Sequence, residues 1–568
     1  MVRKTLSILM VVTLLSGAFV FAPAGVETAI AAPNAAVTYN LYATDGYISL
    51  ADGKPLYIYG FVGGRSTDNL SYYDPTLQAA VPYSGTNSTP QPAPAPSGGM
   101  RTAAELPLLG KAQLPGPAIY AATGDVVEIR LKNLGIQANT IAPNDPHSIH
   151  LHGLDVDAAN DGVPETSVGA VPANLCNDGT SDTTGTVASD FDCATQGGLA
   201  PGAGNVIVYM FTPETPGTSM WHCHQEADIH VQMGMYGALV IYNPTDPAYL
   251  NGGPGKGFGG TYNGFKYDRD MILLLSEVDT TFHDAEGGLY DTLYPAVTVT
   301  ATNGTTATIP GTSKPIVWNP IDYHPQYWLI NGLSFPDTIH ANAGVDFNEW
   351  NTAYQNYDPF IIGSVGTTTG YAHDQWNTPG EKILLRMINM GYEAQPMHIH
   401  GYHLKVLGND QRPWPWSNRV LWGKPTPFGQ GLEKNTILIG SGETYELLLD
   451  MGQQALSSTY PAGTQTRYEA GSTPYANEPR SNTATTYPGI PDAGDPAPGV
   501  GTYITGPVVT GVMLPIQGGI IANPGPDTAV VNVSTGGQVF PFHNHDDYKA
   551  TNDGFYPGGQ FTAVLAQP

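Results

Sequence analysis

The sequence has few positive charges and few long apolar runs. Its 22 lysines and arginines stand against 49 aspartates and glutamates, so the formal net charge is −27. A chain this acidic lacks the basic surface that nucleic acid binding requires, which favours neutral or cationic substrates. Beyond the N-terminal segment, no stretch approaches the roughly 18 apolar residues that span a bilayer, so we expect a soluble mature protein without a membrane partner.

The N-terminus has the three regions of a secretory signal peptide. The charged start M-V-R-K precedes an apolar run from Leu6 to Ala22, and the small residues of T-A-I-A-A-P follow. We predict that residues 1–31 form the signal, with cleavage after Ala31 and an uncleaved membrane anchor as the alternative. The mature protein is then expected to be secreted, periplasmic or on the cell surface.

The chain has only three cysteines, which we interpret as one potential disulfide pair and one unpaired cysteine. Cys176 and Cys193 flank a polar loop of Asp, Thr, Ser and Gly that cannot hold itself with an apolar core. An oxidising compartment permits a disulfide between them, worth about 3 kcal/mol on the chain-entropy model. Cys223 remains for other chemistry.

Turn-forming and aromatic residues are abundant, whereas a long amphipathic helical period is missing. The chain has 68 Gly, 49 Pro and 32 Tyr, a composition that favours strands and turns, and we predict an all-β fold. A Gly-rich linker between Asn251 and Gly264 divides the chain, giving predicted domains at residues 32–250 and 251–568. The Thr/Pro/Gly/Ala-rich segment 460–501 is predicted to be a surface loop.

Histidines recur in pairs with one residue between them. There are four such pairs: His150/His152, His222/His224, His398/His400 and His543/His545. Random placement of 15 His in 568 residues would give about 0.4 pairs. Alternate residues of a strand point to the same face, so each pair presents two imidazoles side by side. Eight such imidazoles predict a cluster of several metal ions.

The second pair brackets a cysteine in the segment W-H-C-H-Q-E-A-D-I-H-V-Q-M-G-M. One thiolate, two imidazoles and a distant thioether are the ligands of a blue-copper electron-transfer centre. The upstream segment H-S-I-H-L-H-G supplies a further imidazole. The predicted ligands of this centre are His147, Cys223, His230 and Met235, with Met233 as a competitor for the axial position. Because Cys223 is bonded through the backbone to His222 and His224, a covalent path for electrons connects this centre to the predicted cluster.

These motifs resemble those of the multicopper oxidases, and the order of the motifs repeats in the two halves. The resemblance implies two cupredoxin-like Greek-key β-barrels and four coppers per chain. It assigns the type 1 copper to the mononuclear ligands above and the type 2 copper to His150 and His398. It assigns the type 3 copper pair to His152, His222, His224, His400, His543 and His545.

The sequence departs from the family pattern in two places. Five residues, Gln225 to Ile229, separate His224 from His230, where laccase-like members usually have three. In the second half, Gln395 stands where a type 1 histidine would be, and Asn544 stands in place of the cysteine. A carboxamide replaces neither a thiolate nor an imidazole for copper, so the second half is predicted to lack a mononuclear centre.

The resemblance implies a copper-dependent oxidoreductase of laccase or metallo-oxidase type. The reducing substrate would be either a phenol or one of the metal ions Fe(II), Mn(II) and Cu(I), and it would give electrons through the edge of His230. Cys223 and its flanking His222 and His224 would pass the electrons to the cluster. There dioxygen would be reduced to water. Two-domain relatives form homotrimers that share the cluster between subunits; a monomer is the alternative. A copper nitrite reductase, which needs only three His at its catalytic copper, and a non-catalytic cupredoxin are the alternative functions.

Several acids and histidines near these motifs allow two interpretations. Asp155, Asp157, Asp161 and Glu226 lie close to ligands and are candidates for proton delivery, but an Asp in a turn more commonly accepts a backbone hydrogen bond. Glu226 and Asp228 beside His230 are candidates to hold a metal-ion substrate. The unpaired histidines are predicted to be surface or loop residues: His283, His324, His340 and His373. The spacing of His403 turns it away from the face of the His398 pair.

Overall fold

The computed structural model describes most of the region between residues 36 and 567. The described residues are 36–67, 71–74, 79–82, 101–102, 104–137, 145–172, 206–287, 290–294, 297–300, 306–309, 312–315, 318, 320–342, 359–364, 380–414, 432–453, 509–513, 530–533 and 538–567. Four predictions fall outside them: the signal peptide, the Cys176–Cys193 disulfide, His373 and the 460–501 loop. Among the described residues, no helix is both long and apolar enough to cross a bilayer.

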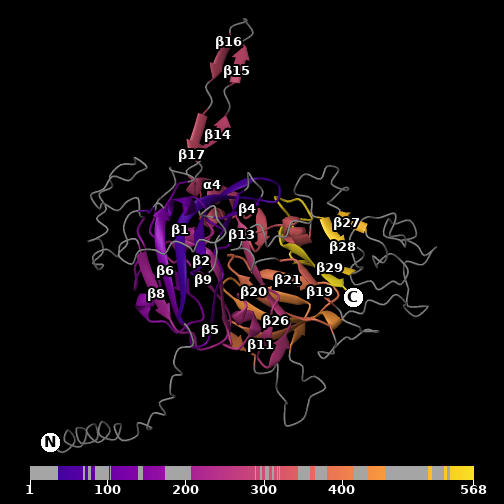
Figure 1. Cartoon of the computed structure of the whole chain (residues 1–568). Coiled ribbons are helices and arrows are strands. Elements are labelled where there is room, and N and C mark those ends of the chain that lie inside the picture. The colour runs from indigo at the N-terminus through magenta and orange to yellow at the C-terminus, as the bar shows by residue number, and fades with distance from the viewer. Residues whose placement is uncertain are drawn as a thin grey trace, which may run out of the picture.

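The first half of the chain folds into two four-stranded sheets (Figure 1). One sheet has the spatial order β2 (Pro55–Arg65), β1 (Ala36–Ser49), β6 (Val126–Gly135), β8 (Val206–Phe211). The other has the order β5 (Ile119–Ala122), β10 (Tyr236–Tyr242), β9 (Gly217–His222), β7 (His150–Leu151). Within each sheet one neighbouring pair is parallel, β1/β6 and β5/β10, and the remaining pairs are antiparallel.

The second half contributes two larger sheets. The first runs in the order β18 (Tyr327–Ile330), β13 (Arg269–Val278), β20 (Lys382–Asn389), β26 (Thr444–Asp450), β22 (Leu404–Asn409), β23 (Arg412–Pro413), with β24 (Glu433–Lys434) also paired to β22. The second runs in the order β19 (Ile361–Ser364), β30 (Phe561–Gln567), β29 (Gln538–Asn544), β21 (Gln395–Ile399), β25 (Thr436–Ile439). The parallel pairs are β13/β20 and β19/β30.

The two halves repeat one topology. The sequence of antiparallel, parallel and antiparallel neighbours along β2-β1-β6-β8 recurs along β18-β13-β20-β26. The sequence of parallel, antiparallel and antiparallel neighbours along β5-β10-β9-β7 recurs along β19-β30-β29-β21. The predicted fold class, all-β with cupredoxin-like barrels, is confirmed. The repeat also makes β7 equivalent to β21 and β9 equivalent to β29.

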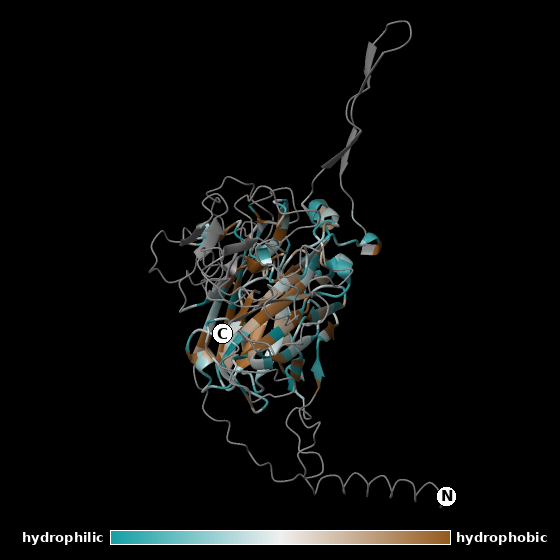
Figure 2. Ribbon diagram, turned by 90° about the vertical axis from the view of Figure 1, so that its right-hand side faces the viewer, coloured by the Kyte–Doolittle hydropathy of each residue, from teal (hydrophilic) through white to brown (hydrophobic). Residues whose placement is uncertain are grey.

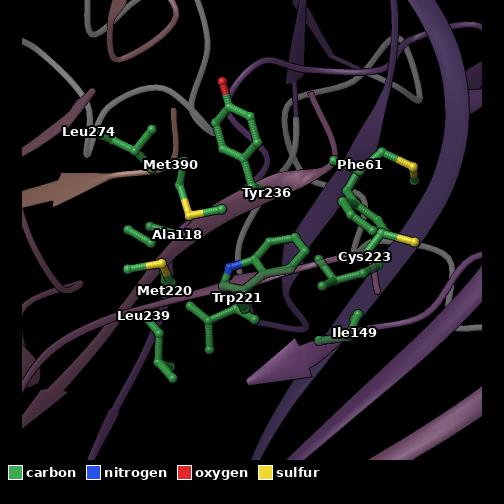
Figure 3. Packing of buried hydrophobic residues seen from close by; sticks show 14 of the residues in the cluster. Phe61, Ala118, Ile149, Met220, Trp221, Cys223, Tyr236, Leu239, Leu274 and Met390 are labelled. Carbon is green, nitrogen blue, oxygen red and sulfur yellow. The ribbon is translucent and has the colours of Figure 1, made fainter. Parts of the chain in front are cut away.

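Buried apolar residues fill the interior of both halves. Figure 2 shows many strand segments inside the body in brown, the colour of hydrophobic residues, and teal mainly towards its outside. The cluster around Trp221 and Cys223 includes second-half residues such as Leu274 and Met390, so the apolar core continues across the boundary between the halves (Figure 3). A second cluster, which contains Leu385, lies within the second half. Burial of apolar surface on this scale is the main stabilising contribution to the fold.

A buried polar group also joins the halves. Arg386 on β20 donates to Asp270 Oδ2 at 2.7 Å and to Thr218 Oγ1 on β9 at 3.0 Å. Tyr242 on β10 donates to the same Asp270 oxygen at 2.7 Å, and the Arg386 guanidinium lies 4.9 Å from the centre of the Tyr242 ring. The Arg386–Asp270 ion pair belongs to the second half, and the first half supplies the Thr218 and Tyr242 contacts. Separating the halves would remove these two partners from a buried ion pair, so the contacts favour one relative position of the halves.

Short helices and hairpins complete the described structure. The α-helices are α2 (Ala227–His230), α3 (Pro247–Leu250) and α4 (Thr280–Glu286). The 3₁₀ turns are η1 (Leu106–Leu108), η2 (Ala158–Asn160), η5 (Pro320–Asp322), η6 (Asp337–Asn342), η9 (Met451–Gln453) and η10 (Asp547–Lys549). The strand pairs outside the main sheets are β3 (Ser71–Asp74)/β4 (Ala79–Pro82), β11 (Gly260–Tyr262)/β12 (Phe265–Tyr267), β14 (Tyr290–Tyr294)/β17 (Thr312–Pro315), β15 (Val297–Thr300)/β16 (Thr306–Ile309) and β27 (Val509–Met513)/β28 (Val530–Val533). The pairs β14/β17 and β15/β16 form an arm that projects from the body beyond α4 (Figure 1).

Candidate metal centres

A thiol and two imidazoles meet in the buried interior of the first half. The ligating atoms of His147, Cys223 and His230 all lie within 4.8 Å of one another. Cys223 Sγ is 3.9 Å from His147 Nδ1 and 3.4 Å from His230 Nδ1, and the two imidazole centres are 4.6 Å apart. The three residues are buried. This donor set suits a mononuclear copper centre, because one soft thiolate and two imidazoles converge on a point shielded from water.

Three different segments supply these ligands. Cys223 follows the end of β9, while His147 lies before β7 and is held by backbone hydrogen bonds in both directions with Ala170 (3.0 and 2.7 Å). The Ser148 N–H donates to Cys223 Sγ at 3.4 Å, which stabilises negative charge on the sulfur. His230 closes the group from α2. Only the tertiary fold brings these segments to one point.

The methionine assigned to the axial position is well placed for that role. The β9/β10 register pairs His222 with Tyr236, and the Cys223 N–H donates to the Met235 carbonyl at 2.9 Å. Residues that oppose one another in an antiparallel pair place their side chains on the same face. Met233 is equally buried, and its carbonyl accepts from Tyr59 N–H at 3.1 Å. The pairing with Cys223 favours Met235.

The five residues between His224 and His230 form a defined turn. Glu226 adopts φ 44° and ψ 57°, a left-handed conformation that is uncommon for a residue with a side chain. It begins α2, and its carbonyl accepts from the N–H groups of Ile229 and His230 at 2.9 and 2.8 Å. The additional residues are therefore used to start one helical turn whose last residue is the ligand His230. The Glu226 side chain is left exposed next to that ligand.

The two imidazoles of this centre sit in different electrostatic surroundings. Burial, followed by the nearby His230, lowers the pKa of His147 well below its usual value, so this ring is neutral and able to donate a lone pair. Burial also opposes a charge on His230, but the Asp145 carboxylate, 3.8 Å from Nε2, and Cys223 Sγ, 3.4 Å from Nδ1, outweigh it and raise its pKa to about 10. The surroundings of His230 thus favour positive charge at that ring.

The first four paired histidines form one quartet between β7 and β9. The ladder pairs His150 with His222, and His152 Nε2 lies 3.0 Å from His222 Nε2. The ring centre of His150 is 4.8 Å from that of His152, 5.2 Å from that of His222 and 5.1 Å from that of His224. The potential ligand atoms of His150, His152 and His222 lie within 4.8 Å of one another, close enough to hold a metal ion.

The second quartet repeats the first between β21 and β29. The ladder pairs His398 with His543, and His400 Nε2 lies 3.1 Å from His543 Nε2. The His398 ring centre is 4.8 Å from that of His400 and 5.1 Å from that of His545. The equivalent contacts in the two quartets agree closely, as expected if one binding arrangement has been duplicated.

Both members of a pair face the same group, although the second member lies just beyond its strand. His152, His224, His400 and His545 all follow the last strand residue of their segment. After the first and third pairs the chain turns at Gly153 (φ +75°) and Gly401 (φ +68°). This conformation suits glycine because a side chain would be strained there.

Hydrogen bonds fix the orientation of three of these rings. His150 Nδ1 donates to the Asp161 carbonyl, His222 Nδ1 to the Cys223 carbonyl and His543 Nδ1 to the Asn544 carbonyl, each at 2.8 Å. A carbonyl oxygen can only accept, so Nδ1 carries the proton and Nε2 keeps its lone pair. This is the tautomer that binds a metal ion through Nε2, with the ring held by its other nitrogen.

Burial keeps several of the quartet imidazoles neutral. It is the largest cause that lowers the pKa of His152 to about 4 and that of His222 to about 3, and it also lowers the pKa values of His398 and His543. Neighbouring imidazoles add to the effect in each case. Neutral imidazoles at pH 7 are the form that ligates metal ions.

A network of amide side chains fills the place in the second half that corresponds to the mononuclear centre. Asn544 Nδ2 donates to Gln395 Oε1 and to Gln560 Oε1, both at 2.7 Å, and Gln395 Nε2 donates to Glu277 Oε2 at 2.8 Å. All four side chains are buried. The two carboxamides that the sequence places at ligand positions therefore satisfy one another, and Gln560 and Glu277 complete the network. No pattern in the sequence indicated these two residues.

The Glu277 carboxyl makes the stability of the protein dependent on pH. Burial raises its pKa to about 7, although N–H and O–H donors partly oppose the shift. Between its unfolded value near 4.5 and pH 7, the folded state binds more protons than the unfolded state, so stability falls as pH rises through this window. We expect Glu277→Gln to remove a pH-dependent contribution of about 3 kcal/mol.

The measurement is urea unfolding of the copper-loaded protein at pH 5 and pH 8, with Glu165→Gln as an exposed control. The fall in unfolding free energy from pH 5 to pH 8 should be smaller for Glu277→Gln than for the parent, and unchanged for the control. The same fall in all three proteins would show that Glu277 does not govern this window.

Two of the acids considered for proton delivery make local structural contacts in the described chain. Asp157 accepts from the N–H groups of Ala159 and Asn160 and caps η2, and Asp161 holds the ring of His150. His324 is exposed, as predicted, and His340 lies in η6. The prediction for His283 is wrong: it is buried in α4, where Nδ1 donates to the Tyr57 carbonyl at 2.6 Å. An isolated seven-residue helix gave no periodic signal that could have revealed this burial.

Part of the chain is similar to known copper proteins. The sequence profile of the multicopper oxidases matches residues 97–245 and 347–455. Laccase-9 of Oryza sativa subsp. japonica is 30% identical over 165 residues, and copper resistance protein A of Escherichia coli is 24% identical over 164 residues. Each match covers 29% of this chain but only 20% and 18% of the respective relatives, so the chain spans about a fifth of their length.

Solved structures of copper enzymes also resemble this chain. The blue copper oxidase from Nitrosomonas europaea superposes with a TM-score of 0.42 at 16% sequence identity, covering 93% of this chain and 85% of the other.

Proposed function

We propose that this chain, a relative of the multicopper oxidases, is itself a copper-dependent oxidase that takes single electrons from a small reducing substrate and reduces dioxygen to water. One observation carries the proposal. Cys223 Sγ faces His147 and His230, while His222, its neighbour in the chain, points Nε2 at His152. A single backbone step therefore joins a mononuclear donor set to a quartet of imidazoles.

Copper, when bound, supplies one-electron transfer at the first site and four-electron reduction of dioxygen at the second. The residues that would hold the type 1 copper are His147, Cys223, His230 and Met235. Those for the type 2 copper are His150 and His398, and those for the type 3 pair are His152, His222, His224, His400, His543 and His545. Their chemistry fits: the thiol is buried between imidazoles, and the tautomers of His150, His222 and His543 leave Nε2 free.

The protein's own groups have distinct roles in this proposal. His230 presents Nδ1 to the sulfur and its opposite edge, Nε2, to the partly exposed Asp145 carboxylate at 3.8 Å, and electrons would enter at this edge. The Ser148 N–H stabilises the thiolate, and the Asp161 carbonyl orients His150. Substrate electrons would pass from His230 through Cys223 to His222 and His224. Because these groups are held by backbone hydrogen bonds, little reorganisation is required at each transfer.

We further propose a homotrimer of two-domain chains, with domains at residues 32–250 and 251–568. The exposure of the quartets supports it: His545 is exposed and His398 is partly exposed, as are His150 and His224 in the first quartet. A dioxygen-reducing cluster works best when water is excluded. Pairing the first quartet of one subunit with the second quartet of its neighbour would cover both and complete the eight ligands.

Copper analysis gives a direct prediction. Fully loaded protein is expected to hold four coppers per chain and to show an intense blue thiolate-to-copper band, because one mononuclear set and eight paired imidazoles are present. Metal content by mass spectrometry, together with dioxygen uptake on a phenol and on Mn(II), measures both properties. Two coppers per chain with nitrite consumption would instead indicate a nitrite reductase-like enzyme, and copper without turnover a binding protein.

The substrate class within the oxidases is either a phenol or a low-valent metal ion. The relatives named a laccase and a copper resistance protein are compatible with either class. We propose a location outside the cytoplasm, where the predicted signal segment would deliver the chain.

A further inference from the structure

Three tyrosines, Tyr47, Tyr57 and Tyr59, form a row of rings that leads from the mononuclear site to the surface. Tyr57 and Tyr59 stand two residues apart on β2 and share a face of the sheet, and the β1/β2 register places Tyr47 directly opposite Tyr57. The ring centres of Tyr47 and Tyr57 are 5.3 Å apart, and those of Tyr57 and Tyr59 are 5.7 Å apart. The Tyr59 ring centre lies 5.8 Å from that of His230 and 6.1 Å from that of His147. Aromatic rings at these separations are in contact, so the tyrosine row is unbroken.

Only the outer end of the tyrosine row reaches solvent. Tyr57 and Tyr59 are each 1% exposed, whereas Tyr47 is 47% exposed. His230 is fully buried, and the Asp145 carboxylate lies 3.8 Å from its Nε2 edge. A large molecule in solution can therefore touch the row at Tyr47, but it cannot touch the imidazole of His230.

A buried carboxylate accepts a hydrogen bond from the middle tyrosine. The Tyr57 hydroxyl donates to Asp45 Oδ2 at 3.1 Å, and Asp45 Oδ1 accepts from the Gln137 N–H at 2.8 Å. Burial, followed by the charge of Asp45, raises the pKa of Tyr57 above its usual value, so this phenol keeps its proton at neutral pH. A neutral phenol loses an electron more readily when a base takes its proton, and Asp45 is placed to do so. Apolar packing alone would not require this carboxylate, because burying one costs free energy.

We propose that the tyrosine row is a second electron-entry route, which accepts single electrons at Tyr47 from phenolic reductants too large to reach His230. The inference rests on the proposed oxidase function and adds an entry site for one class of substrate. A substrate phenol can lie against the exposed Tyr47 ring from outside, as Tyr57 does from inside. Because both partners are phenols, the same electron and proton pass between like groups.

Electrons and protons balance at each step of this route. The electrons leave the tyrosine row towards Cu(II) at the mononuclear site, which the proposed oxidase reaction regenerates with dioxygen. Tyr57 gives one electron inwards, with the Tyr59 ring as the bridge, and gives its proton to Asp45. Tyr47 then reduces the Tyr57 radical and releases its own proton to water, while Asp45 returns the proton to Tyr57. The substrate phenol restores Tyr47 with one electron and one proton and leaves as a phenoxyl radical. Four cycles release four protons and supply four electrons, which together reduce one dioxygen to two waters.

The test combines radical trapping with matched tyrosine-to-phenylalanine variants. Copper-loaded protein is kept in air with a nitroso spin trap and no added reductant, and peptide mass spectrometry locates the trap on the chain. Tyr47→Phe and Tyr57→Phe keep the rings and remove the phenol hydroxyls. Tyr556→Phe is the control, because Tyr556 is 43% exposed but lies in the second half. Cys223→Ser removes the thiolate through which electrons leave the mononuclear site.

We expect the trap on Tyr47 in the parent protein and in Tyr556→Phe, and about tenfold less of it in Tyr57→Phe, where the row is interrupted. Cys223→Ser should carry no trap on Tyr47. Tyr556 should carry none in any of these proteins, although it is exposed to a similar extent. Tyr47→Phe changes a single exposed hydroxyl, so it tests the inference independently of how well Tyr57→Phe folds.

The second readout compares a phenol attached to a dextran polymer with the same phenol free in solution. The ratio of kcat/KM for the attached phenol to that for the free phenol should fall by about tenfold in Tyr47→Phe and in Tyr57→Phe, and should keep the parent value in Tyr556→Phe. An untrapped Tyr47, or an unchanged ratio, in protein that shows the blue band and takes up dioxygen would overturn this inference alone. A copper-loaded parent without the band and without dioxygen uptake would overturn the oxidase proposal, and the inference with it.

Discussion

Replacement of Cys223 by serine is expected to abolish the blue absorption band and reduce substrate oxidation by roughly three orders of magnitude or more. The sulfur lies 3.4 Å from His230 Nδ1 and is the group that joins the mononuclear ligands to His222 and His224. A serine hydroxyl is a poor ligand for copper in such a site and gives no thiolate band. The imidazole quartets remain, so the copper content should fall from four to three per chain.

A control for this substitution is available in the second half. Asn544 occupies the position between His543 and His545 that Cys223 occupies between His222 and His224. Asn544→Ser disturbs the amide network with Gln395 and is expected to lower stability by about 1–3 kcal/mol. It should leave the blue band intact. A Cys223→Ser protein that keeps the band, measured by visible absorption at full copper loading, would exclude this cysteine as the type 1 ligand.

Mixing two inactive variants is expected to restore oxidase activity. In the proposed trimer, each cluster uses the first quartet of one subunit and the second quartet of its neighbour. His150→Ala and His398→Ala each damage every cluster when alone, so each should be inactive. In trimers assembled from equal amounts of both, about one interface in four combines two intact quartets. Activity near a quarter of the parent value is therefore expected after joint refolding with copper.

The molecular mass and the activity of the mixed variants distinguish a trimer from a monomer. Mass measurement by light scattering should give a trimer, and the mixture should gain activity only when the chains are refolded together. Mixing the two variants without refolding serves as the control, since subunits that do not exchange form no hybrid interface. A monomer with full activity, or a refolded mixture that stays inactive, would favour closure of the cluster within one chain.

Local motifs carry much of the site because ligand chemistry is specific to residue type. The sequence contains a cysteine between two histidines, together with four histidine pairs. This combination indicates copper even before the fold is known, since few other functions use it. The repeated motif order also predicted a duplicated β architecture, and the strand pairing of the two halves shows the same repeat. The prediction of an exposed or loop position for His283 is wrong because its burial depends on the packing of α4 against β2, which no local sequence pattern reveals.

The sequence by itself determined which histidines and cysteine are candidate copper ligands, because side-chain chemistry and spacing along a strand are local properties. The tertiary structure decided how they are used. It brought His147, Cys223 and His230 together from three segments and placed Asp145 beside His230. It filled the equivalent place in the second half with a buried network of Glu277, Gln395, Asn544 and Gln560. These contacts join residues far apart in the chain, and only the packing of the sheets and their connecting segments fixes such distances.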